Sequence, residues 1–222
     1  MLGSSIKVGG PGIDNTPTGT DALTGVAISS NAFYDHAADL DAHTRNLFQL
    51  IRTGNYFAPA PLGAAGGGFG LDANRLFAIP FIVARNLTID RLAIHVGTGV
   101  AGSARLGIYN DGTNLYPGTL LKDVGVVDVT TAGIKAATIT GNLALTKGLY
   151  HLVALADVTP TVRDCSLSWS PYGHSATEFA PTAELGRWEV AQTYGALPDP
   201  FPAGGAQGIT IPIILPRLLS LD

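Results

Sequence analysis

From residue 75 onward, hydrophobic and polar positions mostly alternate, which is the pattern of β-strands with one buried face. Runs of this kind span residues 75–83, 86–96, 104–109, 124–129, 134–139, 149–155, 162–169 and 209–215. Turns rich in Gly, Pro and Asn separate these runs, and no helical pattern comes between them. The pattern predicts a mainly β protein with a jelly-roll-like β-sandwich head over residues 75–222.

The alternation fades between residues 170 and 208, where several prolines indicate a long irregular excursion. Long loops in a compact domain are usually functional or packed on a neighbour. Aromatic residues gather here and serve either as a lid on the core or as a contact surface. We expect Trp169 to belong to the core, and Tyr172 and Tyr194 to lie at the surface.

One α-helix is predicted over residues 30–53. Ser30 or Asn31 is suited to cap its N-terminus, and Gly54 is suited to end it. Aspartates lie towards the start and arginines towards the end, which complements the helix dipole.

The apolar positions of this helix fit a heptad repeat. The a and d positions are Phe33, His36, Leu40, His43, Leu47 and Leu50. We expect these six residues to hold a short trimeric coiled coil together, because the flanking segments offer the helix little to pack on. The alternative is an ordinary amphipathic stripe. The two histidines are either polar seam residues that fix the register or ligands of an anion or metal on the trimer axis.

The segments on either side of the helix are not expected to form a core of their own. Residues 1–29 are either a disordered tail or an arm that becomes ordered on a partner, and their scattered apolar residues favour an extended anchoring arm. Residues 54–74 contain the glycine-rich run between Gly63 and Gly70. By composition this segment is a Gly-rich hinge between helix and head.

Composition favours a protein that buries surface against partners. Charged residues make up 14% of the chain and hydrophobic residues 46%, with 28 glycines and 14 prolines. The net charge of −4 and the scattered Lys and Arg residues argue against nucleic-acid binding. The start of the chain does not resemble a signal peptide, and the longest apolar run, residues 76–84, is too short to span a bilayer. We therefore expect synthesis in a cytoplasm and no membrane insertion.

The sequence contains no complete catalytic or metal-binding motif, so we expect no enzyme activity and no cofactor. Glu178, Glu184 and Glu189 are either a source of glycosidase carboxylates or solvated loop acids, and their weak context favours the second interpretation. Cys165 lies in an expected strand and is interpreted as a buried, inert thiol.

The candidate ligand contacts are Asn110, Asp111, Tyr172 and Tyr194. Asn110 and Asp111 begin an oxygen-rich run that ends at Asn114, which is suited either to calcium or sugar binding or simply to a β-turn. The two tyrosines are candidates because aromatic rings stack on sugar rings.

Three runs resemble β-sandwich domains of tailed-bacteriophage fibre and spike proteins. They are Ala104–Gly112 (ARLGIYNDG), Tyr116–Leu121 (YPGTLL) and Lys147–Ala156 (KGLYHLVALA). In those domains a strand ending in Tyr-Asn or Tyr-Asp leads to a Pro-Gly turn, and a later Gly-x-Tyr or Gly-x-Trp opens a core strand. The layout of arm, short coiled coil, glycine hinge and β head also resembles trimeric virion fibres.

The resemblance implies a structural virion protein that is assembled in the bacterial host cytoplasm. Its arm would dock on capsid, portal or tail proteins, its helix would form a homotrimer, and its β head would face host-surface glycan. Two alternatives stay open: a carbohydrate-binding, lectin-like module, and a capsid decoration protein without receptor binding. A glycan-degrading enzyme would require a carboxylate pair.

Overall fold

The computed structural model describes residues 51–59, 62–66, 68–167 and 186–221. The chain divides into two compact units, residues 1–50 and residues 51–222. All described residues belong to the second unit, which we call the β unit. The predicted arm (1–29), nearly all of the predicted helix (30–53) and the six seam residues lie outside the described part.

The β unit is mainly β, as the alternating pattern predicted. In chain order its strands are β1 (Leu62–Ala65), β2 (Phe69–Gly70), β3 (Arg75–Val83), β4 (Leu87–Thr98), β5 (Ser103–Asp111), β6 (Pro117–Asp128), β7 (Gly133–Leu145), β8 (Gly148–Ala156), β9 (Thr161–Val162), β10 (Asp164–Leu167), β11 (Arg187–Ala191), β12 (Ala206–Gly208), β13 (Thr210–Pro212) and β14 (Ile214–Leu221). A 3-10 turn, η2 (Thr113–Leu115), separates β5 from β6.

One layer is a six-stranded sheet with the strand order β12-β11-β3-β8-β5-β6. Its central strands β3 and β8 pair antiparallel over nearly their whole lengths, from Leu76 opposite Leu155 to Val83 opposite Gly148. Both faces of β3 are almost wholly buried. This explains why its sequence, RLFAIPFIV, is a nearly continuous apolar run rather than a strict alternation.

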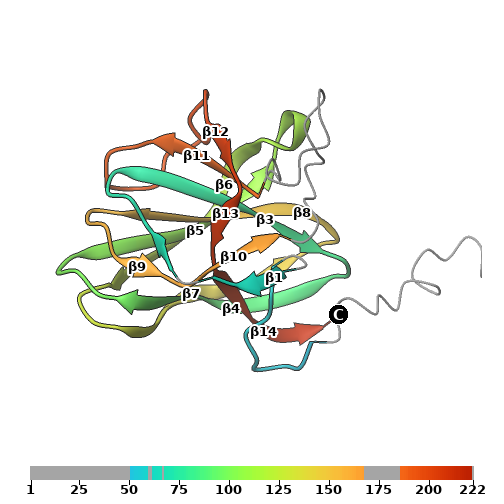
Figure 1. Ribbon diagram of the computed structural model, residues 1–222. Helices are drawn as coiled ribbons and strands as arrows, with labels where there is room; N and C mark the ends of the chain where they lie inside the picture. The colour runs from blue at the N-terminus through green and yellow to red at the C-terminus, as the bar shows by residue number, and fades with distance from the viewer. Residues whose placement is uncertain (1–50, 60–61, 67, 168–185, 222) are drawn as a thin grey trace, which may run out of the picture. The chain divides into compact units, whose positions relative to one another are not determined.

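The second layer is built around β4 and is called the β4 sheet here. β7 pairs with one edge of β4, and β14 and then β9 pair with the other. A three-stranded group, β1-β10-β13, continues this layer, since β10 follows β9 and β13 precedes β14 along the chain. Figure 1 shows β3, β5 and β8 stacked over β4 and β7.

The main core lies between the two layers. It is formed by the inward-facing residues of β3, β4, β5, β7 and β8, and includes Phe77, Phe81, Leu92, Ile108 and Leu152. Each of these side chains stabilises the fold by about 1.5–3 kcal/mol when fully buried. Cys165 belongs to this core and is 1% exposed, which confirms the predicted burial. Burial, together with the charge of Asp164, raises the pKa of its thiol to about 11.

A second cluster lies on the outer face of the six-stranded sheet, under residues 192–205, the cover segment. The cluster includes Tyr109 of β5, Leu155 of β8, and Leu197 and Phe201 of the cover segment. Phe201 N donates to Gly118 O at 2.9 Å, and its ring meets that of Tyr109 edge-on with 5.4 Å between centroids. Phe201 therefore belongs to a lid over the sheet, one of the two roles considered for the aromatic residues of this region.

The glycine-rich stretch differs from the hinge predicted over residues 54–74. It contributes β1, which pairs with β10, and β2, which pairs with β9. Gly66 N donates to Asp164 O at 2.9 Å, and Gly68 N donates to the Asp164 carboxylate at 2.8 Å. A Cβ at Gly66 would overlap that carboxylate. Glycine is used here for close approach to a neighbouring strand rather than for flexibility.

The β unit also begins earlier than residue 75. Residues 51–53, the predicted end of the helix, are not helical. Beyond them, Gly54 N donates to Leu218 O at 2.7 Å, and Leu218 N donates to Asn55 O at 3.0 Å. The reason is tertiary, because pairing with β14 satisfies this backbone where local sequence favoured a helix end.

Candidate functional site

The oxygen-rich turn that was predicted as a ligand contact closes on itself. Asn110 Nδ2 donates to Thr119 Oγ1 at 2.9 Å, across the hairpin of β5 and β6. Asp111 Oδ1 lies 3.2 Å from His151 Nε2 of β8. Gly112 N donates to Tyr116 O at 2.8 Å. These contacts match the alternative interpretation of a β-turn between two strands.

The other candidate ligand contacts do not join this turn. Tyr172 lies outside the described residues. Tyr194 lies in the cover segment, where its backbone N–H donates to Asn74 Oδ1 at 2.8 Å and its side chain packs on the second cluster. Positions along β8 give the separation of the two places. Asn110 lies opposite Tyr150 of β8, whereas Leu76 of β3, two residues after Asn74, lies opposite Leu155. Five residues of strand, about 17 Å, therefore separate the two places.

His151 was not singled out from the sequence, yet it is a fully buried ionisable residue beside this turn. It is 0% exposed, and burial lowers the pKa of its imidazole, while the hydrogen bond to Asp111 opposes that shift. His151 lies opposite Tyr109 on β5. The sequence did contain a signal for the burial of His151. It is the polar residue within the otherwise apolar run of β8, from Leu149 to Ala156.

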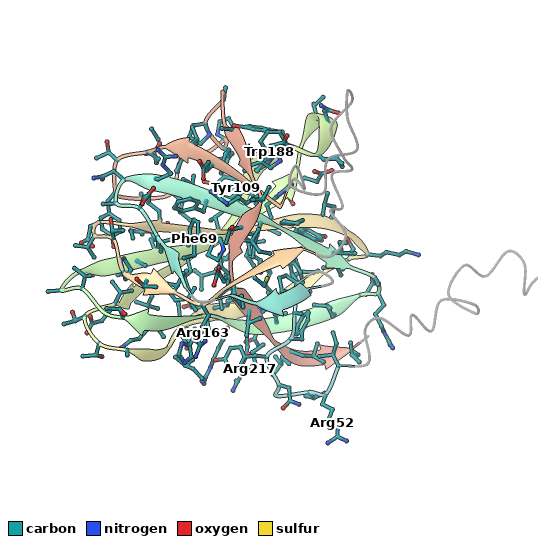
Figure 2. All side chains as sticks on the ribbon, viewed as in Figure 1. Arg52, Phe69, Tyr109, Arg163, Trp188 and Arg217 are labelled. Carbon is teal, nitrogen blue, oxygen red and sulfur yellow. The ribbon has the colours of Figure 1, made fainter. Side chains whose placement is uncertain are left out.

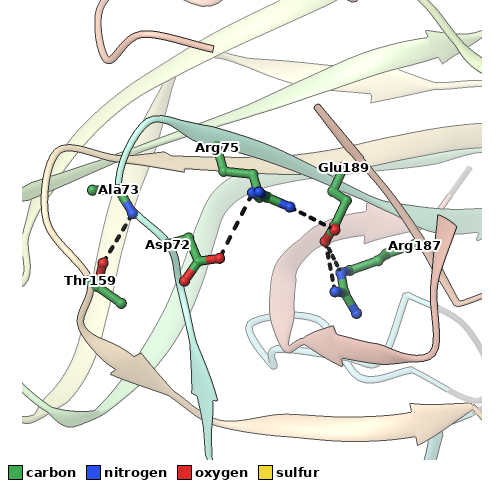
Figure 3. A network of polar contacts seen from close by, with 6 residues as sticks. All are labelled: Asp72, Ala73, Arg75, Thr159, Arg187 and Glu189. Atoms are coloured by element: carbon green, nitrogen blue, oxygen red, sulfur yellow. Dashed lines mark hydrogen bonds and ion pairs between the residues drawn. The ribbon is translucent and has the colours of Figure 1, made fainter. Parts of the chain in front are cut away.

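Glu189, one of the three acids considered as glycosidase carboxylates, is held in an ion-pair network on β11 of the six-stranded sheet (Figure 3). Arg75 Nη1 donates to Glu189 Oε1 at 2.8 Å, and Arg187 Nη2 donates to Oε2 at 2.7 Å. The Arg187 guanidinium also lies 4.8 Å from the centroid of the Phe69 ring. Both carboxylate oxygens are thus occupied: Oε1 joins β11 to Arg75 of β3, and Oε2 is bound by Arg187 of β11 itself. Glu178 and Glu184 lie outside the described residues.

A different set of charged residues meets on the outer face of the β4 sheet. Residues directly opposite one another on paired strands point to the same face of a sheet. Arg91 on β4 lies opposite Arg217 on β14, and the carbonyl of His95 accepts a hydrogen bond from Arg163 N at 2.8 Å. Arg163 is exposed and lies between the buried residues Val162 and Asp164, so it points outward. We call Arg91, His95, Arg163 and Arg217 the cationic face.

An apolar strip lies between the Arg91 and Arg217 pair and the His95 and Arg163 pair. Its members are the residues paired across β14, β4 and β7, namely Leu215, Ala93 and Ala136. Thr138 and Ile134 flank the strip on β7, opposite Arg91 and His95 respectively. Figure 2 shows Arg163 and Arg217 on the same side of the molecule, away from Tyr109 and Trp188 on the six-stranded sheet.

The charges of the cationic face are only partly balanced among the described residues. Asp90 lies where the pairing of β4 with β7 is irregular, and Arg217 donates to both of its carboxylate oxygens. This hydrogen bonding, with the nearby charges of Arg217 and Arg91, holds the pKa of Asp90 below its ordinary value despite burial. Arg91 Nε and His95 Nδ1 are buried and form no hydrogen bond within the described part of the chain.

Large apolar side chains are also exposed near the β7 edge of the β4 sheet. Ile134 on β7 is 68% exposed, and Val126 on β6, which belongs to the six-stranded sheet, is 49% exposed. The outward positions of β7 are otherwise small or uncharged, with Ala136, Thr138 and Thr140 all exposed. The outward side chains of this edge are therefore mainly apolar or neutral, although Lys135 of β7 and Lys122, which donates to Thr140 O, lie close by.

Neither a metal cluster nor a membrane-spanning helix is found among the described residues. No three His, Cys, Asp or Glu side chains within residues 51–59, 62–66, 68–167 and 186–221 are placed to hold a metal ion. No helix in that part of the chain is long and apolar enough to cross a bilayer.

Sequence reasoning missed the cationic face because its members are spread from residue 91 to residue 217. Arg91 and His95 are four apart in a predicted strand, which places them on one face, and this was the available local signal. Arg163 and Arg217 join them only through strand pairing that the sequence does not specify.

Comparisons with known proteins give no family. No protein-family model matches the chain, and no curated protein matches it. Among solved structures, the chain is similar to the cysteine protease and lectin-like domains of Cwp84, a surface layer associated protein of Clostridium difficile, with 12% sequence identity and a TM-score of 0.39. The match covers 65% of this chain and spans 32% of that one. A similarity of this size does not establish a shared family.

Proposed function

We propose that the protein is a non-enzymatic structural component of a virion, and that it presents the β unit as a jelly-roll-like head for attachment to the host surface. The segments that carry the resemblance to phage fibre and spike domains support this. They form β5, the start of β6 and β8, which are neighbours in the six-stranded sheet. Residues distant in sequence thus meet in one structural unit.

The observation that carries the proposal is the difference between the outer faces of the two layers. The six-stranded sheet is closed by the cover segment, which is held by hydrogen bonds such as Tyr116 OH to Pro202 O at 2.5 Å. The outer face of the β4 sheet instead exposes Ile134 and Arg163, beside the half-buried Arg91, His95 and Arg217. An exposed apolar patch on a rigid scaffold is typical of a surface that contacts a partner.

In this proposal the N-terminal segments build the assembly and the β unit contacts the host. Residues 1–29 dock on capsid, portal or tail proteins, and residues 30–50 form the trimeric coiled coil. The six seam residues would then bring three β units together. A homotrimer would present three copies of each open face, which raises the effective affinity for a repetitive surface.

The oligomer is tested by measuring the mass of the protein in solution by light scattering. The full-length protein is expected to have three times the 22.9 kDa mass of one chain. A variant lacking residues 1–50 is expected to have the mass of a single shortened chain. Leu47→Asp in the seam should give monomers, whereas the control Gln49→Asp, outside the seam, should stay trimeric. A full-length chain that is monomeric at micromolar concentration would contradict the coiled coil.

Attachment is tested with the fluorescently labelled trimer on intact cells of the host bacterium. Saturable binding is expected, and an excess of unlabelled protein should compete with it. A trimer that shows no saturable binding would contradict host attachment and would favour a decoration protein.

A further inference from the structure

We propose that the cationic face binds an acidic polysaccharide through its carboxylate groups. This inference rests on the proposed attachment role, because it names the chemistry that the head recognises. It concerns the four residues of the cationic face, the apolar strip between them and Tyr56. None of these residues was identified as a site from the sequence.

The spacing of the two ends of the cationic face defines the ligand. Arg91 and His95 are four residues apart on β4, which corresponds to about 13 Å along a strand. Arg217 lies opposite Arg91, and Arg163 is hydrogen-bonded through its backbone to His95. The face therefore offers two positive sites on either side of the apolar strip. A ligand that engages both must be extended and must carry anionic groups at intervals, which describes an acidic polymer rather than a single small anion.

The hydrogen-bonding capacity of the face is incompletely used. Arg217 is engaged by Asp90, but no hydrogen bond or ion pair to the side chains of Arg91 or Arg163 is found within the described residues. Arg91 and Arg217 are like charges directly opposite on paired strands, an arrangement that is destabilising by itself. A bound carboxylate would reduce this repulsion and accept charge-assisted hydrogen bonds from the Arg91 fork.

The surface between the cations suits a sugar ring. Ala136 is exposed and Leu215 is half-buried, so these two offer apolar contact, whereas Ala93 between them is only 3% exposed. Tyr56 forms a β-bridge with Arg217 at the outer edge of β14 and is half-buried. An aromatic ring at this edge is able to stack on the apolar face of a pyranose.

An acidic peptide fits this place less well than a polysaccharide. Peptides commonly bind sheets by adding a strand at a free edge. The cationic face lies in the middle of its layer, where β4 is paired with β7 on one side and with β14 and β9 on the other. Its backbone groups are already used, so a peptide laid across it would leave its own backbone without partners. Sugar hydroxyls are able to stay hydrated instead.

The direct test measures binding of three carboxylated polysaccharides, polygalacturonate, alginate and hyaluronate, by biolayer interferometry on the full chain. Methyl-esterified polygalacturonate has the same backbone without the charge and is the matched ligand control. We expect binding of at least one carboxylated polymer, little binding of the ester, and weakening as salt is raised from low to physiological concentration.

The variants are Arg163→Ala and Arg91→Ala, each expected to weaken binding about tenfold, since a charge-assisted hydrogen bond is lost. The control is Arg52→Ala, which removes the same charge from an exposed residue outside the cationic face and should leave binding unchanged. Thermal unfolding of each variant checks the fold. Arg163 is exposed and its side chain has no partner among the described residues, so its removal should not disturb the fold.

Several results would overturn the inference. One is that none of the three polymers binds, and another is that the methyl ester binds as well as polygalacturonate. The others are that Arg52→Ala weakens binding as much as Arg163→Ala does, or that duplex DNA binds as tightly as the polysaccharides. The proposed function is judged separately on host cells. Cell binding that Arg163→Ala and Arg91→Ala leave unchanged would overturn this inference and keep attachment. Polymer binding that depends on these residues, without any cell binding, would support the ligand chemistry and contradict attachment.

Discussion

The hydroxyl of Tyr109 donates a hydrogen bond to the carbonyl oxygen of Pro198, 2.5 Å away, and so ties the six-stranded sheet to the cover segment. Tyr109 is fully buried, and Tyr109→Phe would leave that carbonyl without this partner. We expect the free energy of unfolding to fall by about 1 kcal/mol, measured by urea denaturation at pH 7. Tyr194→Phe is the control, because the Tyr194 hydroxyl forms no hydrogen bond within the described residues.

The same variant should change the response to alkali. Burial, with the charges of Asp199 and Asp123, raises the pKa of Tyr109 well above its ordinary value of 10.0. Above pH 10 the unfolded chain therefore loses a proton that the folded chain keeps, and stability falls as pH rises. Tyr109→Phe should lose less stability than the wild type between pH 10 and 11. Parallel curves for the two proteins would contradict this.

Gly107 should not tolerate a side chain. A Cβ at this position would overlap Leu197 of the cover segment and lie 3.0 Å from the Lys122 carbonyl. We expect Gly107→Ala to lower the free energy of unfolding by about 1–3 kcal/mol, because a close-packed contact is overfilled. Gly195→Ala is the matched control in the cover segment, since nothing lies within 4 Å of its Cβ position. It should be neutral or slightly stabilising.

The ion pair of Asp90 with Arg217 should contribute to stability at neutral pH. Asp90→Asn is expected to lower the free energy of unfolding by about 2 kcal/mol at pH 7, because a hydrogen bond between charged groups is lost. The pKa of Asp90 is lowered in the folded protein, so this contribution is present above pH 4 and is lost as the carboxylate is protonated in acid. The difference between variant and wild type should therefore shrink below pH 4. Asp72→Asn, in an exposed contact 3.8 Å from Arg75, should have little effect.

His151 should make the protein less stable in mild acid. Burial lowers the pKa of its imidazole, so between the ordinary value of 6.5 and the lowered one the unfolded chain binds a proton that the folded chain does not. Stability then falls as pH drops below 6.5, by up to about 1.4 kcal/mol per pH unit. His151→Gln should flatten the dependence between pH 7 and 5 in thermal melts. A wild-type protein equally stable at both pH values would contradict this prediction.

Much of the β unit was predictable because its strands carry a strong local pattern. Leu92, Ile94 and Val96 recur at every second position of β4, and turn residues mark where most strands end. The strands of the glycine-rich segment were not predicted, because β1 and β2 have few large side chains and so lack this local pattern. Their strand structure depends on pairing with β10 and β9, which lie far along the chain.

The candidate site was less predictable than the fold for the same physical reason. Asn110 and Asp111 stood out because polar residues in a turn are visible locally, yet their side chains hydrogen-bond across the hairpin and to His151. Arg163 and Arg217 belong to no recognisable motif in the sequence. Their significance arises from register, which places them beside His95 and Arg91 on one face of a sheet.

The bond between Gly68 and Asp164 also constrains the order in which the chain acquires its structure. These residues are 96 positions apart, so the first strands of the β unit find their partners only after most of it has been synthesised. Pairings between such distant residues slow folding, and strands that wait unpaired invite aggregation. A waiting segment built from Gly and Ala presents little apolar surface to other chains. The composition that resembled a hinge would thus protect the nascent polypeptide until β9 and β10 emerge from the ribosome.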